Sequence, residues 1–327
     1  MVLLSLFKNS NQAKKNLLIT GEDAFLNDYL VRDYVKNPAL DQLEKRTVDC
    51  ESEGIGELIA DLTEASLFAS EKLLIVKNPI FLTGKVQKKD EKNLKQLEKI
   101  FEKIDQSDDQ LVIICNGKID KRRKISKICQ KNFNLVDVSF KPYEVSGILK
   151  AIIKTENYQI SQSALQLLLE RSDQVMEAAL SNYLKLKNIA TDQKITTEMI
   201  NANIDLSLAQ NIFEILTKAL SHNYQEAILR LEDQLREGQS PIRILAVFES
   251  QLEVLLAAKI LLARSRSEMD VGKELGIHPY RVKLAGQTRI SIKSLEKMLL
   301  AAIKLDYGYK NGTYQGPEFL KMFLLAV

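Results

Sequence analysis

Hydrophobic positions in the first 140 residues fall into short apolar runs, separated by segments in which apolar residues recur at helical spacing. The runs predict strands over residues 16–20, 46–50, 72–76, 111–115 and 135–138. Helices are expected over residues 23–36, 56–64, 90–104 and 118–131. Nearly continuous apolar strands that alternate with helices are typical of a parallel sheet covered on both faces.

After Pro142 the spacing is helical throughout. Short helices are expected first, over residues 145–157, 161–171, 174–187 and 196–203. Longer ones follow, over residues 209–220, 225–237, 241–264, 267–275, 279–285, 291–309 and 318–325. Ser161, Thr196 and Ser240 are candidate N-caps. The predicted fold class is α/β followed by all-α, with an α/β domain over 1–140, a small helical domain over 141–207 and a second helical domain over 208–327.

Composition narrows the protein class without identifying it. The chain has 45% hydrophobic and 27% charged residues, as ordinary soluble globular proteins do. Its three cysteines form no CxxC pair, and with two histidines a metal site is not expected. No apolar run approaches the ~18 residues of a membrane span. We therefore expect a reduced, cytoplasmic protein with no membrane contact, whose apolar residues 1–7 form a short helix on the first domain.

The turn after the first strand lacks the residues that bind phosphate. It reads Gly21-Glu22-Asp23, with a single glycine, two carboxylates and no lysine. Two negative charges at a helix start repel a triphosphate. The third strand ends in Lys77, where a Mg²⁺ site would need a carboxylate, and Asn116 is better explained as a turn residue than as a nucleotide sensor. The sequence predicts no ATP site, no cofactor and no catalytic residue.

Residues 118–131 carry seven basic residues and one acid, a local charge of +6. Such a segment attracts phosphate groups. Arg122 and Arg123 lie in it and are candidate contacts to DNA. A solvated helix face is the alternative interpretation.

Four stretches resemble the delta-subunit family of bacterial DNA polymerase III clamp loaders. In order they are Gly21-Glu22-Asp23-x-Phe25-Leu26, residues 66–73 (Ser-Leu-Phe-Ala-Ser-Glu-Lys-Leu), residues 118–122 (Lys-Ile-Asp-Lys-Arg), and residues 275–283 (Leu-Gly-Ile-His-Pro-Tyr-Arg-Val-Lys) followed by 306–312 (Asp-Tyr-Gly-x-Lys-x-Gly). Their order and spacing run over nearly the whole chain. One departure is Ser-Asn-Tyr-Leu-Lys-Leu at 181–186, where the family often has Asn-Glu-Leu-x-Lys-Leu.

The resemblance implies a RecA/AAA+-like domain without a P-loop over 1–140, a lid domain over 141–207 and a ring-forming collar over 208–327. It also implies a noncatalytic clamp-opening subunit of the clamp loader. Its partners would be the sliding clamp (beta), the ATP-binding gamma/tau subunits and delta prime in a heteropentamer, and primed DNA within that complex.

The resemblance assigns clamp binding to Ser66, Leu67 and Phe68, with the apolar pair inserted into a pocket on the clamp. Burying both side chains contributes ~3–6 kcal/mol before the costs of association. Spacing alone favours packing of the pair in the core of the sheet itself.

The resemblance also places Tyr307 at the primer-template junction, where a ring stacked on an unpaired base is worth ~1–3 kcal/mol. Lys310 extends the same basic and aromatic surface. The alternative is that Tyr307 caps its helix against the collar core.

Two other functions compete with this interpretation. Residues 267–285 have the sequence pattern of a helix-turn-helix, as in a DNA-binding regulator. Gly276 would lie at the turn, and Arg281 and Lys283 on the second helix. Pro279, near the start of that helix, argues against this. A true NTPase with an unusual loop is the third possibility, and the charges that it requires are missing.

Overall fold

The computed structural model describes residues 3–10, 13–63, 71–83, 90–277 and 279–326. The chain forms two compact units, which are Met1–Phe140 with Ala151–Asn157, and Lys141–Lys150 with Tyr158–Val327. Helix α5 (Val145–Thr155) contributes residues to both. The expected boundary between residues 207 and 208 falls inside the second unit, so the separation of a lid from a collar stays a prediction.

The first unit is built on a sheet of order β1-β6-β2-β5-β4-β3. The strands are β1 (Lys8–Ser10), β2 (Leu17–Gly21), β3 (Glu44–Asp49), β4 (Lys72–Lys77), β5 (Gln110–Asn116) and β6 (Asn134–Asp137). All neighbouring pairs are parallel except β1 with β6. The expected parallel strands are confirmed, whereas β1 was not predicted because three polar residues give no apolar signal.

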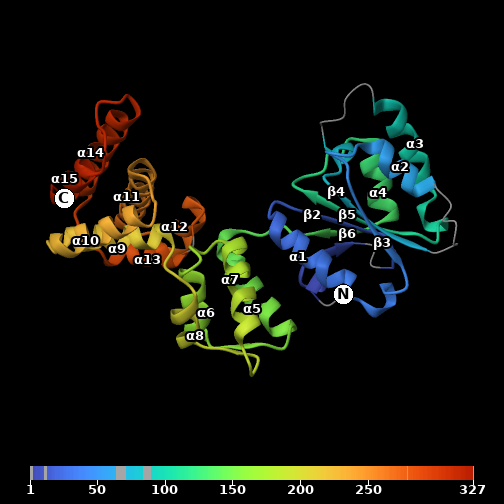
Figure 1. Ribbon diagram of the computed structural model, residues 1–327, viewed down its shortest axis with the longest axis horizontal. Coiled ribbons are helices and arrows are strands. Elements are labelled where there is room, and N and C mark those ends of the chain that lie inside the picture. The colour runs from blue at the N-terminus through green and yellow to red at the C-terminus, as the bar shows by residue number, and fades with distance from the viewer. Residues whose placement is uncertain (1–2, 11–12, 64–70, 84–89, 278, 327) are drawn as a thin grey trace. The chain divides into compact units, whose positions relative to one another are not determined.

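Helices cover both faces of this sheet (Figure 1). On one face, α2 (Ile55–Thr63), α3 (Glu91–Glu102) and α4 (Lys124–Asn132) share a core with alternate residues of β5 such as Ile113. Val112 and Ile114 are also buried and point to the opposite face because successive strand side chains alternate. There α1 (Ala24–Val35) packs on β2 and β5.

The expected N-terminal helix is confirmed as a short 3₁₀ turn, η1 (Leu3–Leu6), which packs against α1. Leu3 and Leu4 are buried, so these apolar residues belong to the core of the first unit. Further 3₁₀ turns are η2 (Pro38–Leu40), η3 (Ile80–Leu82), η5 (Ile104–Gln106) and η6 (Pro142–Glu144).

The second unit is helical except for one small sheet. Strands β7 (Gln159–Ile160) and β8 (Lys194–Ile195) pair in parallel, so the expectation of an entirely helical second half was wrong at these positions. Two residues per strand are too few to show a period of two. The accompanying helices are α6 (Gln162–Glu170), α7 (Met176–Ile189) and α8 (Thr197–Asn203).

The remaining helices share one core with α11 (Pro241–Ala263), whose Phe248 lies fully buried in it. They are α9 (Leu208–Leu220), α10 (Tyr224–Arg236), α12 (Glu268–Leu275), α13 (Pro279–Gln287), α14 (Ile292–Lys310) and α15 (Glu318–Leu325). The predicted N-caps Ser161, Thr196 and Ser240 each accept a hydrogen bond from a backbone N–H of the first turn. Gly276 ends α12 with φ +66°, a left-handed conformation that glycine adopts without strain.

Candidate functional site

An amide network links helix α1 to the carboxyl edge of the sheet between β2 and β5. In an open parallel sheet, ligands bind at this edge where the order of strands reverses. Asn27, on the first turn of α1, is fully buried. Its Nδ2 donates to the carbonyl of Gly21 at 3.0 Å and to Asn116 Oδ1 at 2.9 Å. The Gly117 N–H also donates to the Gly21 carbonyl, at 2.7 Å. A protein side chain therefore lies where a nucleotide-binding sheet presents its phosphate loop.

Gly21 is required by this packing. A Cβ at this position would lie 2.8 Å from Asn27 Oδ1, 3.0 Å from Val138 Cβ and 3.1 Å from the Val138 carbonyl. The glycine in the turn thus permits close approach of a neighbouring side chain and strand.

Carboxylates occupy the positive end of the α1 dipole. Asp23 is the N-cap, and its side chain accepts the Leu26 N–H at 2.8 Å. Glu22 is exposed, with Lys118 Nζ 3.6 Å away. Lys77, at the end of β4, pairs with Asp28 at 3.0 Å. This arrangement satisfies one of the first helix amides and holds negative charge where a phosphate would need positive charge.

The basic segment begins its helix later than expected. Helix α4 starts at Lys124, so the predicted helix over 118–131 was wrong in its first part. The cause is Asp120, whose Oδ1 accepts the Arg122 backbone N–H at 3.1 Å and whose carbonyl accepts the Arg123 N–H at 3.2 Å. These bonds form a turn that competes with the helix.

The two arginines in this turn have different surroundings. The Arg122 side chain is 91% exposed and pairs with Asp120 at 3.0 Å. Hydrogen bonds from Arg122 hold the pKa of the Asp120 carboxyl below its usual range. Arg123 Nη1 donates to the Phe81 carbonyl at 3.1 Å, which joins the turn to η3. Arg122 is therefore accessible to solvent, while Arg123 has a structural partner.

Tyr307 lies on the outer face of α14. Its side chain is 70% exposed, whereas Tyr309, two residues on, is buried and donates its hydroxyl to the Gly316 carbonyl at 2.6 Å. Lys310 is exposed and pairs with Asp306 one turn away at 2.5 Å. The aromatic residue that packs in the helical core is thus Tyr309, and Tyr307 has an accessible ring beside a paired lysine.

The candidate clamp-binding residues Ser66, Leu67 and Phe68 lie outside the described residues. The elements that flank them are α2, which ends at Thr63, and β4, whose first N–H donates to the Asp109 carboxylate at 2.9 Å.

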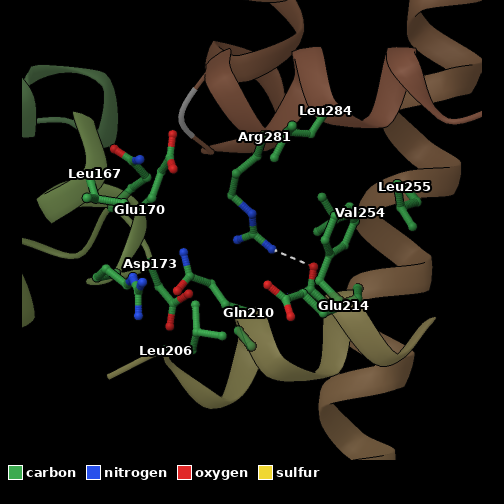
Figure 2. A pocket seen from close by; sticks show the side chains of 15 residues that line it. Leu167, Glu170, Asp173, Leu206, Gln210, Glu214, Val254, Leu255, Arg281 and Leu284 are labelled. Carbon is green, nitrogen blue, oxygen red and sulfur yellow. Dashed lines mark hydrogen bonds between the residues drawn. The ribbon is translucent and has the colours of Figure 1, made fainter. Parts of the chain in front are cut away.

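A cavity of about 320 Å³ in the second unit surrounds Arg281, which the alternative helix-turn-helix interpretation placed on its second helix (Figure 2). The guanidinium is half-buried and donates to Gln251 Oε1 on α11 at 3.0 Å. Burial lowers its pKa, and the nearby Asp173 carboxylate opposes that effect. Ser207, the N-cap of α9, donates its hydroxyl to Asp173 at 2.6 Å. Arg281 is thus directed at neighbouring helices of its own chain.

The geometry of α13 weighs against the helix-turn-helix interpretation. Arg281, which a reading helix would present to base edges, points into the cavity (Figure 2), and Val282 and Ala285 are buried. The sequence could have indicated that Arg281 faces the helical core. Arg281 and Ala285 are one turn apart and so share a helix face.

The described residues also bear on thiol reactivity, metal binding and membrane insertion. The three cysteines are buried, and burial raises the pKa of Cys115 to about 11, which disfavours a reactive thiolate. In the described ranges no group of three or more His, Cys, Asp and Glu side chains is placed to hold a metal ion. Within those ranges, too, no helix combines the length and apolar character needed to cross a bilayer.

Comparison with known proteins gives one consistent relationship. A curated protein of Bacillus subtilis (strain 168) described as DNA polymerase III subunit delta is 27% identical over 284 residues, which are 85% of this chain and 82% of the relative. The solved structure of the Bacillus subtilis DNA clamp loader delta protein has 24% identity and a TM-score of 0.63, over 95% of this chain and 94% of that one. This second likeness supports the fold, a largely parallel sheet domain covered by helices and followed by helical regions.

Two family models match separate parts of the chain. The model described as DNA polymerase III, delta subunit, matches residues 17–139, which contain strands β2 to β6 and the Asn27 edge. The model described as DNA polymerase III delta subunit, C-terminal domain, matches residues 209–327, which contain α14 and the Arg281 motif. The chain therefore belongs to the DNA polymerase III delta subunit family.

Proposed function

We propose that this chain is the noncatalytic, clamp-opening subunit of a replicative clamp loader, which binds the sliding clamp (beta) and loads it on primed DNA. The observation that carries the proposal is the Asn27 network, found inside the domain that matches the delta-subunit model. In this chain, side chains of the protein itself occupy the sheet edge at which a nucleotide would bind. We infer that such a family member acts by binding other macromolecules.

ATP would be bound by neighbouring subunits. A phosphate loop needs free backbone N–H groups and a lysine at the helix start. In this chain the turn offers Asp23, which already accepts the Leu26 N–H, and an exposed Glu22. We propose a heteropentamer with ATP-binding gamma/tau subunits and delta prime, in which residues 208–327 form the collar, 141–207 the lid and 1–140 the clamp-binding domain.

Clamp binding is assigned to Ser66, Leu67 and Phe68. Support comes from the motif and from its flanks, since α2 and β4 both contribute buried residues to the core of the sheet domain. Elements of a rigid core can hold a short segment between them in position for a partner.

Contact with primed DNA is assigned to Tyr307, Lys310, Arg122 and Arg123. The exposed ring of Tyr307 supports a stacking role, because a ring packed into its own core has no free face to offer a base. Exposure of Arg122 likewise supports a phosphate contact, whereas the backbone partner of Arg123 makes its contribution smaller.

The clamp contact is tested with the purified chain and a sliding clamp by size exclusion and by a binding titration. A complex is expected without nucleotide. The double variant Leu67→Ala/Phe68→Ala should weaken it by about thirtyfold or more, the size of an interface hot spot. The matched control is Leu229→Ala/Met322→Ala, which truncates two side chains that are 53% and 63% exposed elsewhere. Equal affinity of both variants would refute the assignment of this pair.

The second test is calorimetry of the purified chain with ATP and Mg²⁺. No saturable heat is expected. Stoichiometric ATP binding that Asn27→Gly strengthens would overturn the proposal, because it would identify the edge as a working nucleotide site.

A further inference from the structure

We propose that the second unit carries a docking groove for a short peptide segment that combines acidic and aliphatic side chains. The groove has a volume of about 830 Å³, which is within the roughly 300–1,000 Å³ typical of ligand pockets. It is bounded by the end of α9, the connection from α13 to α14, and the first turns of α14. It shares no lining residue with the Tyr307 surface, and the inference does not rest on the proposed function.

The apolar part of the groove is an open margin of the helical core. Met298 is buried, the larger apolar side chains beside it are half-buried, and Ala326 is exposed. The larger apolar side chains are Phe213, Leu220, Leu284, Ile290 and Met298. Four of them are aliphatic or thioether side chains, which suit a Leu, Ile or Met side chain of a partner better than a stacked base.

The charged part of the groove is entirely basic. Arg289 and Lys297 line it, His222 stands at its edge, and no acidic residue is among the described lining residues. Neither Arg289 nor Lys297 has an ion pair with another described residue, although several lysines and arginines nearby do, such as Lys218 with Glu226. The groove therefore presents two available positive charges beside apolar surface, and its charge complement is a carboxylate.

Three hydroxyl groups that line the groove donate to backbone carbonyls of α9 and α13. Thr217 Oγ1 donates to the Phe213 carbonyl at 2.8 Å, and Thr288 Oγ1 donates to the Ala285 carbonyl at 2.7 Å. Ser221 Oγ donates to the carbonyls of Thr217 and Lys218 at 3.0 Å. Since these hydroxyl protons are committed to the backbone, the charged donors that the groove offers are the side chains of Arg289 and Lys297, beside the neutral amide of Gln287.

Hydrogen bonds within the chain also preform the groove. Lys259 Nζ donates to the Thr288 carbonyl at 2.7 Å, which fixes the connection that carries Arg289. His222 has φ +60° and its Nδ1 is 2.8 Å from the Tyr224 hydroxyl. A preformed site loses less conformational entropy on binding.

A peptide fits this surface better than a nucleic acid does. Single-stranded nucleic acid is bound by a basic track combined with several aromatic rings. Here Phe213 is the one Phe, Tyr or Trp ring among the described lining residues, and it packs against the helical core. An acidic-aliphatic segment would place its apolar side chains over the core margin and its carboxylates on the two cations.

The test uses the full chain and a fluorescein-labelled octapeptide of alternating Asp and Leu, followed by anisotropy. Saturable binding is expected for this probe and not for the same peptide with Lys in place of Asp. The variant Arg289→Glu/Lys297→Glu should weaken binding at least tenfold. The matched control Lys293→Glu/Lys304→Glu makes the same change of charge on exposed residues of α14 outside the groove, and it should keep affinity within about twofold.

Hydrogen exchange locates the probe independently. Bound peptide should protect backbone amides in residues 213–222 and 284–298. The proposal is overturned if the probe does not bind, if both double variants lose affinity equally, or if protection falls elsewhere. It is also overturned if a fluorescent oligothymidylate binds the wild type and the groove variant abolishes that binding while the peptide stays free.

Discussion

The Asn27 edge of the sheet and the outer face of α14 use their side chains in opposite ways. At the edge, Asn27 is fully buried and its Nδ2 donates to the Gly21 carbonyl and to Asn116 Oδ1, so this donor is used within the chain. On α14, Leu300 and Tyr307 are 60% and 70% exposed and lie two turns apart on one face. The contrast is between a packed sheet edge and a helix face whose apolar and aromatic side chains stay accessible.

The largest expected effect tests whether the edge is closed by packing. Gly21→Ala should lower the free energy of unfolding by up to about 3 kcal/mol, because the new methyl group meets Asn27 Oδ1 and the Val138 carbonyl, and the latter is part of the backbone. Chemical denaturation of the full chain measures it.

The control for this variant is Gly147→Ala in α5, where a Cβ meets no atom within 4 Å. That change should be neutral or stabilising by about 0.5–1 kcal/mol, since alanine favours helix. If Gly21→Ala behaves like Gly147→Ala, the edge has spare room, and the contrast with α14 loses its basis.

The second prediction concerns Arg281. Arg281→Ala should lower the free energy of unfolding by about 2 kcal/mol, because a partly buried hydrogen bond to Gln251 is lost and an acceptor is left without its donor. A double-mutant cycle with Gln251→Ala should give a coupling of at least about 0.5 kcal/mol. Additive effects would show that the bond contributes nothing, and would leave Arg281 available for the helix-turn-helix role.

The sequence predicted what depends on periodicity and capping. The parallel strands, the N-caps at Ser161 and Ser240 and the stop at Gly276 follow from local patterns, and all are present. It did not predict the short strands, because β7 and β8 are too brief to show a period. It also gave the basic segment a helix from 118, because the Asp120 turn depends on one side chain caught by the next amides.

For the candidate site residues, the sequence shows the type of each residue but not the burial or the hydrogen-bond partners of its side chain. The lack of a phosphate loop could be predicted from Glu22 and Asp23, but the part played by Asn27 could not, since its partner Asn116 lies far along the chain. Likewise the sequence left Tyr307 between stacking and packing, and only tertiary structure distinguishes its exposed ring from the buried ring of Tyr309.

The third prediction tests the α14 side of the contrast. Tyr307→Ala should change the free energy of unfolding by no more than about 0.5 kcal/mol, because the ring is mostly exposed. In the assembled loader it should weaken binding of primed DNA about tenfold, as loss of one stacked base would. Anisotropy with primed and blunt DNA separates the two roles. A large loss of stability with unchanged affinity would make Tyr307 a packing residue.

The smallest expected effect distinguishes two neighbouring arginines. Arg122→Ala should reduce the slope of log K against log salt for DNA binding by about 0.7–0.9, the value for one lost phosphate contact, with no change in stability because the side chain is 91% exposed. Arg123→Ala should change this slope less and lower the stability more. Its guanidinium is bonded to the Phe81 carbonyl, and its loss removes that link between the turn and η3. Salt titrations and thermal unfolding of both variants provide the comparison. Equal reductions in slope would mean that Arg123 leaves Phe81 when DNA binds, and the division between groups that the chain satisfies itself and groups that it offers to a partner would then fail at this turn.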